Sequence, residues 1–139
     1  MSMKRPLSKD LIVFPSDCSE KLSANFTTKE FCDSAAKHSM VSMDLITKLQ
    51  KMRELLGKPI LVNSGYRSPE TQQRLRDQGY QTASSISTHQ VGCAADIRSP
   101  GVNTDELEKV ARQAGFESVG VAKTFIHVDT RPGYRRWSY

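Results

Sequence analysis

Residues 87–97 read STHQVGCAADI, and they place His89 and Asp96 seven positions apart with mainly small residues between them. The chain has only three histidines in 139 residues, so a histidine at this position calls for a chemical reason. The polar residues up to His89 predict a loop, and the apolar run after it predicts a short strand that ends near Asp96. Further along the chain, His127 lies between two β-branched residues, which predicts a second strand.

These three side chains are the ligand set of a catalytic zinc site, in which two imidazoles and one carboxylate leave a fourth position for water. A structural zinc site has four protein ligands, usually with cysteine, and Cys18, Cys32 and Cys93 are not grouped in that way. Three cysteines cannot all pair, so we expect reduced thiols and no disulfide framework. Spacing alone leaves a second interpretation open, in which the histidines are ordinary core or surface residues.

The rest of the sequence predicts an α+β fold, a single small domain with a short, mostly antiparallel sheet flanked by helices. Helices are expected over residues 28–37, 43–57, 68–79 and 103–115, from capping residues, apolar periodicity and terminal glycines. Strands are expected over residues 60–62, 93–97, 117–121 and 124–130, the last two as a hairpin. Residues 1–24 are predicted to be an irregular arm on a domain formed by residues 25–139. His38, near the end of the first expected helix, is interpreted as a surface or capping residue.

Composition and charge restrict the class of protein. The chain is 37% hydrophobic and 25% charged, as in globular proteins. No apolar run approaches the roughly 18 residues of a membrane span, and LIVF is too short for a signal-peptide core, so we expect a chain that is cytoplasmic as synthesised. The net charge of +5 would suit nucleic acid, an anionic membrane or an acidic polymer such as a cell wall. Lysine and arginine are scattered except in the terminal RPGYRRWSY, so no nucleic-acid partner is expected.

The segment from Ser87 to Asp96 fits the pattern S-x-H-x-x-G-x-A-x-D, and it resembles the zinc-binding signature of the peptidase M15 family. This family comprises D-alanyl-D-alanine carboxypeptidases and related peptidoglycan endopeptidases. Two further segments resemble the family in the same order. SGYRSPE, at residues 64–70, is similar to its arginine segment, and FIHVDTRPGYRRW, at residues 125–137, is similar to its terminal H-x-D stretch. The resemblance spans residues 26–137.

The resemblance implies a Zn²⁺ ion held by His89, Asp96 and His127. It also implies that Arg67 binds a substrate carboxylate, for which a guanidinium is suited because it donates two parallel hydrogen bonds. Ser87 is expected to orient a ligand or a nearby carbonyl, with an ordinary loop hydroxyl as the alternative. The small residues Gly92 and Ala94 are expected to leave room for the ion.

The chain departs from the family pattern at the position of the general base. Many family members carry a Glu, Asp or His two or three residues before the last histidine ligand, but here those positions hold Phe125 and Thr124. Asp129 is the best substitute, because residues two apart on a strand point to the same face. It is interpreted as the base or as a hydrogen-bond acceptor for His127, with a slight preference for the base.

The resemblance therefore implies a monomeric zinc metallopeptidase that cuts peptidoglycan stem peptides, as carboxypeptidase or endopeptidase. Without a signal peptide, a phage lysin or virion-associated enzyme fits, as does an intracellular protein. The alternative is a non-catalytic, metal-containing module that binds cell wall or serves as a phage structural part. The aromatic residues Tyr134, Trp137 and Tyr139 are interpreted as a terminal lid on the core, or as a surface that stacks on a sugar.

Overall fold

The chain folds into two sheets with helices packed against them, and the structure, a computed structural model, describes residues 5–6, 10–79, 89 and 92–139. The first sheet has the order β1 (Arg5–Pro6), β2 (Leu11–Pro15), β3 (His38–Ser42). The second has the order β4 (Leu61–Ser64), β5 (Ala94–Arg98), β7 (Ile126–Asp129), β6 (Ser118–Val121), β8 (Arg135–Ser138). The helices of the described residues are α1 (Met43–Leu56), α2 (Pro69–Asp77) and α3 (Thr104–Gln113), and Thr28–Phe31 forms a 3-10 turn, η1.

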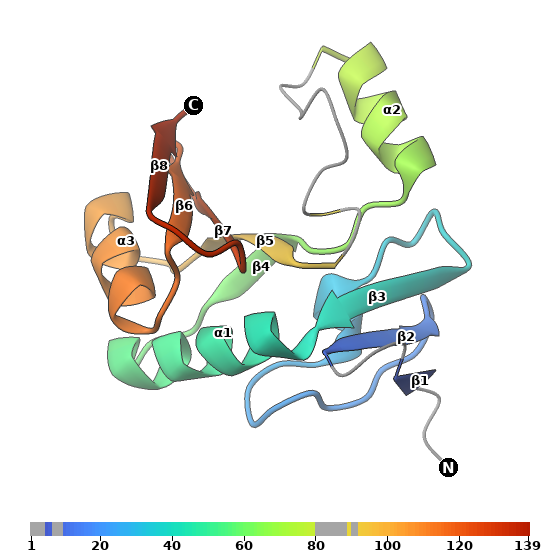
Figure 1. Cartoon of the computed structure of the whole chain (residues 1–139), viewed down its shortest axis with the longest axis horizontal. Coiled ribbons are helices and arrows are strands. Elements are labelled where there is room, and N and C mark those ends of the chain that lie inside the picture. Colours follow the sequence, from blue (N-terminus) through green and yellow to red (C-terminus); the bar gives the residue numbers. More distant parts are fainter. Residues whose placement is uncertain (1–4, 7–9, 80–88, 90–91) are drawn as a thin grey trace.

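The predicted fold class is confirmed. Every strand pair of the second sheet is antiparallel except β6 with β8, which is parallel. The hairpin expected near the end of the chain is the antiparallel pair β6 and β7. In Figure 1, α3 lies beside β6 and α1 runs below the second sheet.

One face of the second sheet packs on α1 and α3 and forms the core. Alternate strand residues point to opposite faces, and the core-facing set is Ala95, Ile97, Val119, Ile126 and Val128, each fully buried. Helix α1 begins at Ser42, whose hydroxyl accepts a hydrogen bond from the Leu45 amide, and it ends at Gly57 in the left-handed conformation. The opposite face of the sheet is therefore available for polar side chains.

Two predictions about the N-terminal part are wrong. Leu11–Pro15 is not irregular, because it forms β2 and pairs with β3. The helix expected over residues 28–37 is only the single turn η1, and His38 begins β3 instead of ending a helix. The reason is local: the Asp33 carboxylate accepts a hydrogen bond from the Ala35 amide, and the Asp33 amide donates to the Ser39 hydroxyl. These side-chain bonds replace the helical backbone bonds. The division of the chain at residue 24 stays a prediction.

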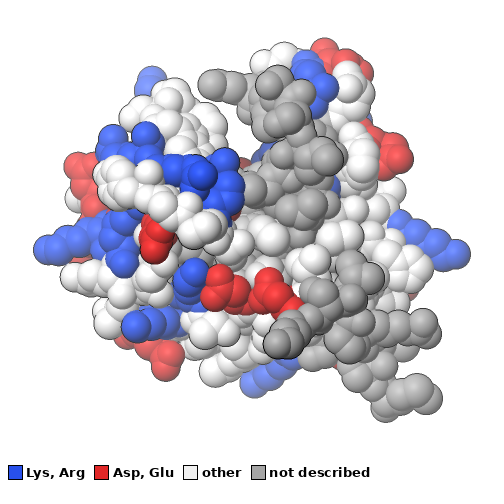
Figure 2. Space-filling model, viewed as in Figure 1, with Lys and Arg blue, Asp and Glu red and all other residues white. Residues whose placement is uncertain are grey.

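Positive charge is unevenly spread over the surface. Figure 2 shows lysine and arginine side chains gathered over the region of α3 and β8, on the left of the view. Among the described residues, no helix has the length and apolar composition needed to cross a bilayer.

Candidate metal site

The open face of the second sheet carries the site in one cross-strand row. Pairing between neighbouring strands aligns five residues across the whole sheet, in the order Ser64, Asp96, His127, Gly120, Trp137. Because paired residues on adjacent strands project to the same face, the carboxylate of Asp96 and the imidazole of His127 meet in the middle of this row.

His89 completes a cluster with these two side chains. One ligand atom from each of His89, Asp96 and His127 lies within 4.8 Å of the others, and all three side chains are buried. Nδ1 of His127 is 3.1 Å from Oδ1 of Asp96, and Nε2 of His89 is 3.4 Å from the same oxygen. Ligand atoms about 2.1 Å from a tetrahedral ion are separated by about 3.4 Å. The cluster could therefore hold a metal ion, and zinc as its occupant stays a prediction.

The outer nitrogen of each imidazole is held by an acceptor. Nδ1 of His89 lies 2.7 Å from the carbonyl oxygen of Gly65. A carbonyl oxygen only accepts, so Nδ1 carries the proton and Nε2 offers its lone pair to the cluster. His127 has the reverse arrangement: Nε2 lies 2.8 Å from Oδ2 of Asp129, and Nδ1 faces Asp96. Such outer contacts fix the tautomer and ring orientation of histidine ligands in metal sites.

Asp129 is fully enclosed by its partners. Its side chain has no exposed surface, and its oxygens accept hydrogen bonds from His127, the Ser118 hydroxyl, and the guanidinium and amide of Arg131. Burial alone would raise the pKa of Asp129, but the hydrogen bonds from His127 and Arg131 lower it well below its usual range. These contacts are those of a group that orients His127, so the geometry favours the second of the two interpretations for Asp129. Its role stays a prediction.

The charges in the cluster act on one another. Burial alone would lower the pKa of His127, but its hydrogen bonds to Asp129 and Asp96 raise it. Burial alone would raise the pKa of Asp96, but hydrogen bonds and charge interactions with the two histidines lower it strongly. The site therefore favours a carboxylate at Asp96, which is the form that binds a cation.

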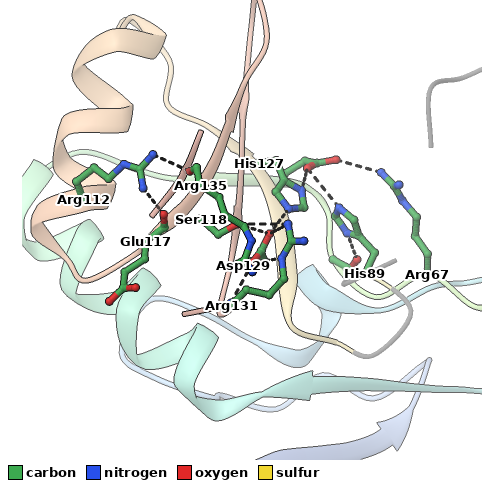
Figure 3. Close-up of polar contacts among 11 residues, drawn as sticks. Arg67, His89, Arg112, Glu117, Ser118, His127, Asp129, Arg131 and Arg135 are labelled. Atoms are coloured by element: carbon green, nitrogen blue, oxygen red, sulfur yellow. Dashed lines mark hydrogen bonds and ion pairs between the residues drawn. The ribbon is translucent and has the colours of Figure 1, made fainter. Parts of the chain in front are cut away.

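Arg67 lies at the edge of the cluster, in the loop between β4 and α2. Its Nη2 is 3.0 Å from Oδ2 of Asp96, and its Nε donates to the Ser64 hydroxyl at 2.9 Å. The Arg67 amide also donates to the His89 carbonyl. Figure 3 shows Arg67 and His89 side by side next to His127. The predicted substrate arginine is thus adjacent to the predicted metal ligands, where it can reach a bound carboxylate.

The loop that carries Arg67 is held in place by Phe31 and Asp33, two residues that the sequence patterns did not indicate. Gly65 lies so close to Phe31 that a Cβ there would be 2.7 Å from the Phe31 Cα. The Asp33 carboxylate accepts a hydrogen bond from the Ser68 amide at 2.9 Å. Asp33 is buried, and an acidic residue inside a predicted helix gave no signal of this contact.

Gly92 has a different role from the one expected. It adopts a φ of 71°, and a Cβ there would lie 2.6 Å from the Met40 carbonyl oxygen. The Ser42 amide donates to the Gly92 carbonyl, so the segment after His89 is anchored on β3. Glycine is needed for this close approach and not for space around the ion. Ser87 lies outside the described residues.

Trp137 is the residue whose place in the site was least predictable. Its ring lies over Gly120, where a Cβ would be only 2.4 Å from the indole, and its centroid is 5.2 Å from that of His127. Tyr139 also contacts Trp137, at 6.3 Å between centroids. Trp137 therefore forms a wall of the candidate metal site.

Comparison with known proteins agrees with this geometry. The family model described as Peptidase M15 matches residues 19–129, which include all three cluster residues. The chain is 33% identical over 107 residues to the peptidoglycan L,D-endopeptidase MepK of Escherichia coli strain K12, and the protein of the same name from Shigella flexneri gives the same values. The match covers 74% of this chain and 58% of each relative, so the chain spans little more than half the length of these relatives.

Proposed function

The chain belongs to the peptidase M15 family, and on this premise we propose that it is a zinc-dependent metallopeptidase that hydrolyses peptide bonds in peptidoglycan stem peptides. The observation that carries the proposal is the cluster of His89, Asp96 and His127, whose ligand atoms lie within 4.8 Å of one another. Two imidazoles and one carboxylate suit zinc and leave a position open. The name of the relatives supports cleavage as an endopeptidase, acting at the cell wall.

The residues of the chain have separate tasks in this mechanism. Nε2 of His89, Nδ1 of His127 and the carboxylate of Asp96 would hold the ion. Zinc, when bound, polarises a scissile carbonyl and lowers the pKa of water toward neutrality. Asp129 keeps the His127 ring in the orientation that turns Nδ1 toward the cluster. Arg67 binds a carboxylate of the substrate through its guanidinium and thereby places the peptide beside the ion.

A non-catalytic module that binds metal and cell wall is the second candidate. It is favoured by the absence of an acid or histidine at positions 124 and 125, which hold Thr124 and Phe125. It is also favoured by Asp129, whose carboxylate is buried and already accepts hydrogen bonds from three residues. Family membership alone does not decide between these two candidates.

Zymography on purified peptidoglycan separates the two candidates. The enzyme is expected to clear the gel, to lose this activity with a chelator and to regain it with added zinc. His127→Ala should be inactive under the same conditions, whereas His38→Ala, which alters an exposed histidine on β3, should clear normally. Binding to peptidoglycan without clearing, at saturating zinc, would favour the module. Mass spectrometry of released fragments identifies the bond that is cut.

A further inference from the structure

An open pocket lies next to the metal site, at the edge of the second sheet. It has a volume of about 650 Å³ and is lined by Arg131, Tyr134, Arg135, Arg136 and Trp137, which we call the arginine pocket. It belongs to the positively charged region over β8 and α3 in Figure 2. Trp137 is shared between the pocket and the metal site, because the same ring contacts His127. A ligand that fills the pocket therefore lies against the ring that contacts His127.

The three arginines of the pocket differ in how their charge is balanced. Arg131 is bound to the buried Asp129 through Nε and Nη2, and Nε of Arg136 lies 2.8 Å from the Glu108 carboxylate. Arg135 has no acidic partner among the residues that the structure describes; its Nη1 donates to the Pro132 carbonyl. Arg135 is also exposed. It is thus the cation of the pocket whose charge remains available to a ligand.

The pocket is held in shape before any ligand binds. The guanidinium of Arg112 stacks on the Tyr134 ring, 4.4 Å from its centroid. The same guanidinium donates to the carbonyl oxygens of Glu117 and Arg135, which fixes the backbone of β8 beside α3. The Glu117 carboxylate is itself engaged by the Gly133 amide. A rigid rim lowers the entropic cost of ordering side chains around a ligand.

Arg67 and Arg135 flank the metal site from opposite edges of the sheet. Arg67 follows β4, which is one edge, and Arg135 lies on β8, which is the other. Figure 3 shows the two arginines coming from opposite sides of His127. Four strand spacings separate β4 from β8, or about 19 Å, and an extended peptide of roughly five to six residues has that length.

We propose that the arginine pocket binds a free carboxylate of the substrate peptide, on the opposite side of the metal site from the carboxylate held by Arg67. This inference rests on the proposed function and adds a specificity to it. A carboxylate accepts charge-assisted hydrogen bonds from Arg135 through two oxygens, whereas a carboxamide in its place has no charge and only one acceptor oxygen. The protein should therefore discriminate against stem peptides that are amidated at this one position.

Synthetic stem peptides in which each free carboxylate is replaced in turn by a carboxamide test the inference. For the zinc-loaded wild type, one replacement should lower kcat/KM by about tenfold through loss of contact with the pocket, and another through loss of contact with Arg67. In Arg135→Gln, the replacement at the carboxylate bound by the pocket should no longer lower kcat/KM. The replacement at the carboxylate bound by Arg67 should still lower it. Arg53→Gln removes a positive charge from α1, on the other side of the sheet. In this variant both replacements should lower kcat/KM as in the wild type.

Binding measurements separate this inference from the proposed function. Titration calorimetry with chelator-treated protein and the same peptides reports recognition without hydrolysis. If no peptide is cut but the wild type binds the carboxylate form about tenfold more tightly and Arg135→Gln does not, the inference stands and the peptidase activity fails. The inference would be overturned, even if hydrolysis is observed, by any of three results. The wild type binds carboxylate and carboxamide peptides equally well, Arg135→Gln keeps the wild-type preference for the carboxylate, or no peptide binds.

Discussion

Nε2 of His127 lies 2.8 Å from Oδ2 of Asp129, on the side of the imidazole that faces away from Asp96 and His89. This contact places the carboxylate behind a predicted metal ligand, on the side of the ring opposite to the nitrogen that faces Asp96. Because Asp129 is fully buried, water does not reach it as readily as it reaches an exposed carboxylate. The pair therefore has the arrangement by which outer carboxylates orient histidine ligands and raise their basicity.

Asp129→Asn tests this assignment. The amide keeps the size of the side chain but removes the charge next to His127, so zinc should bind about 10–100-fold more weakly. Turnover should return to near the wild-type value at saturating zinc. Asp17→Asn, at an exposed position, serves as the control in the same zinc titration. Unchanged zinc affinity with turnover about 10²–10⁴-fold lower at every zinc concentration would instead identify Asp129 as the general base.

Metal content tests the ligand set directly. Wild-type protein purified with zinc should carry about one ion per chain, measured by elemental analysis. His89→Ala and His127→Ala each remove one of three ligands and should lose the ion. The third histidine, His38, is exposed at the start of β3, so His38→Ala should retain it. Full occupancy in both ligand variants would show that the ion, if present, is bound elsewhere.

The sequence predicted the cluster of His89, Asp96 and His127 better than the residues that surround it. His89, Asp96 and His127 are the residue types that zinc requires, and strand alternation together with the pairing of β5 and β7 brings two of them face to face. The placement of Trp137 depends on the parallel pairing of β6 with β8, and no turn motif in the sequence predicts this pairing. Parallel pairs lack the short hairpin turn that makes antiparallel neighbours recognisable in a sequence.

Strand β2 was not predicted for a related reason, namely that its pairing partner is not its neighbour in the sequence. Leu11–Pro15 pairs with His38–Ser42, so its partner lies far away along the chain. The proline at its end and the short apolar run both argue against a strand when the segment is read alone. The capping box formed by Thr27 and Glu30 is present as predicted, but it begins a single turn, because side-chain bonds of Asp33 end the helical path.

Arg67→Lys tests the substrate carboxylate. Lysine keeps the charge but loses the two-pronged geometry, so kcat/KM on a stem peptide should fall by at least roughly tenfold, on the order of 1.4 kcal/mol. Arg67 also contacts Asp96, so zinc affinity is measured beside the kinetics to separate the two effects. Arg53→Lys on α1 is the matched control. Wild-type kinetics in Arg67→Lys would remove Arg67 from substrate binding.

Gly120→Ala tests the contact between Trp137 and the metal site. The added Cβ would overlap the indole, so the ring must move away from His127, at a cost of about 1–3 kcal/mol in the free energy of unfolding. Trp137 is the only tryptophan, so its fluorescence reports the displacement and should respond to zinc in the wild type. In a Trp137→Ala background the cost of Gly120→Ala should largely vanish, since the clashing ring is gone. An equal cost in both backgrounds would contradict this explanation.

Asp33→Asn tests the support of the Arg67 loop through pH. Burial alone would raise the pKa of Asp33, but hydrogen bonds from Ser68, Thr71 and Ala35 together lower it. A carboxyl whose pKa is lower in the folded than in the unfolded state stabilises the fold above the unfolded pKa, near 3.9, and this stabilisation is lost as the pH falls through the folded pKa. The variant should therefore be less stable than the wild type by about 1 kcal/mol at pH 7, since a hydrogen bond to a charged group becomes one to a neutral group.

The difference between wild type and Asp33→Asn should shrink steadily as the pH is lowered below about 4, because both side chains are then neutral. Urea unfolding at a series of pH values measures this difference in the free energy of unfolding. Asp17→Asn, which removes an exposed carboxylate, is the control. The Asp33 carboxylate holds the Ser68 amide, next to Arg67, so KM for a stem peptide should rise in Asp33→Asn while zinc affinity stays unchanged. A stability difference that does not depend on pH would mean that the ionised carboxylate contributes nothing to this loop, and its effect would then lie in packing alone.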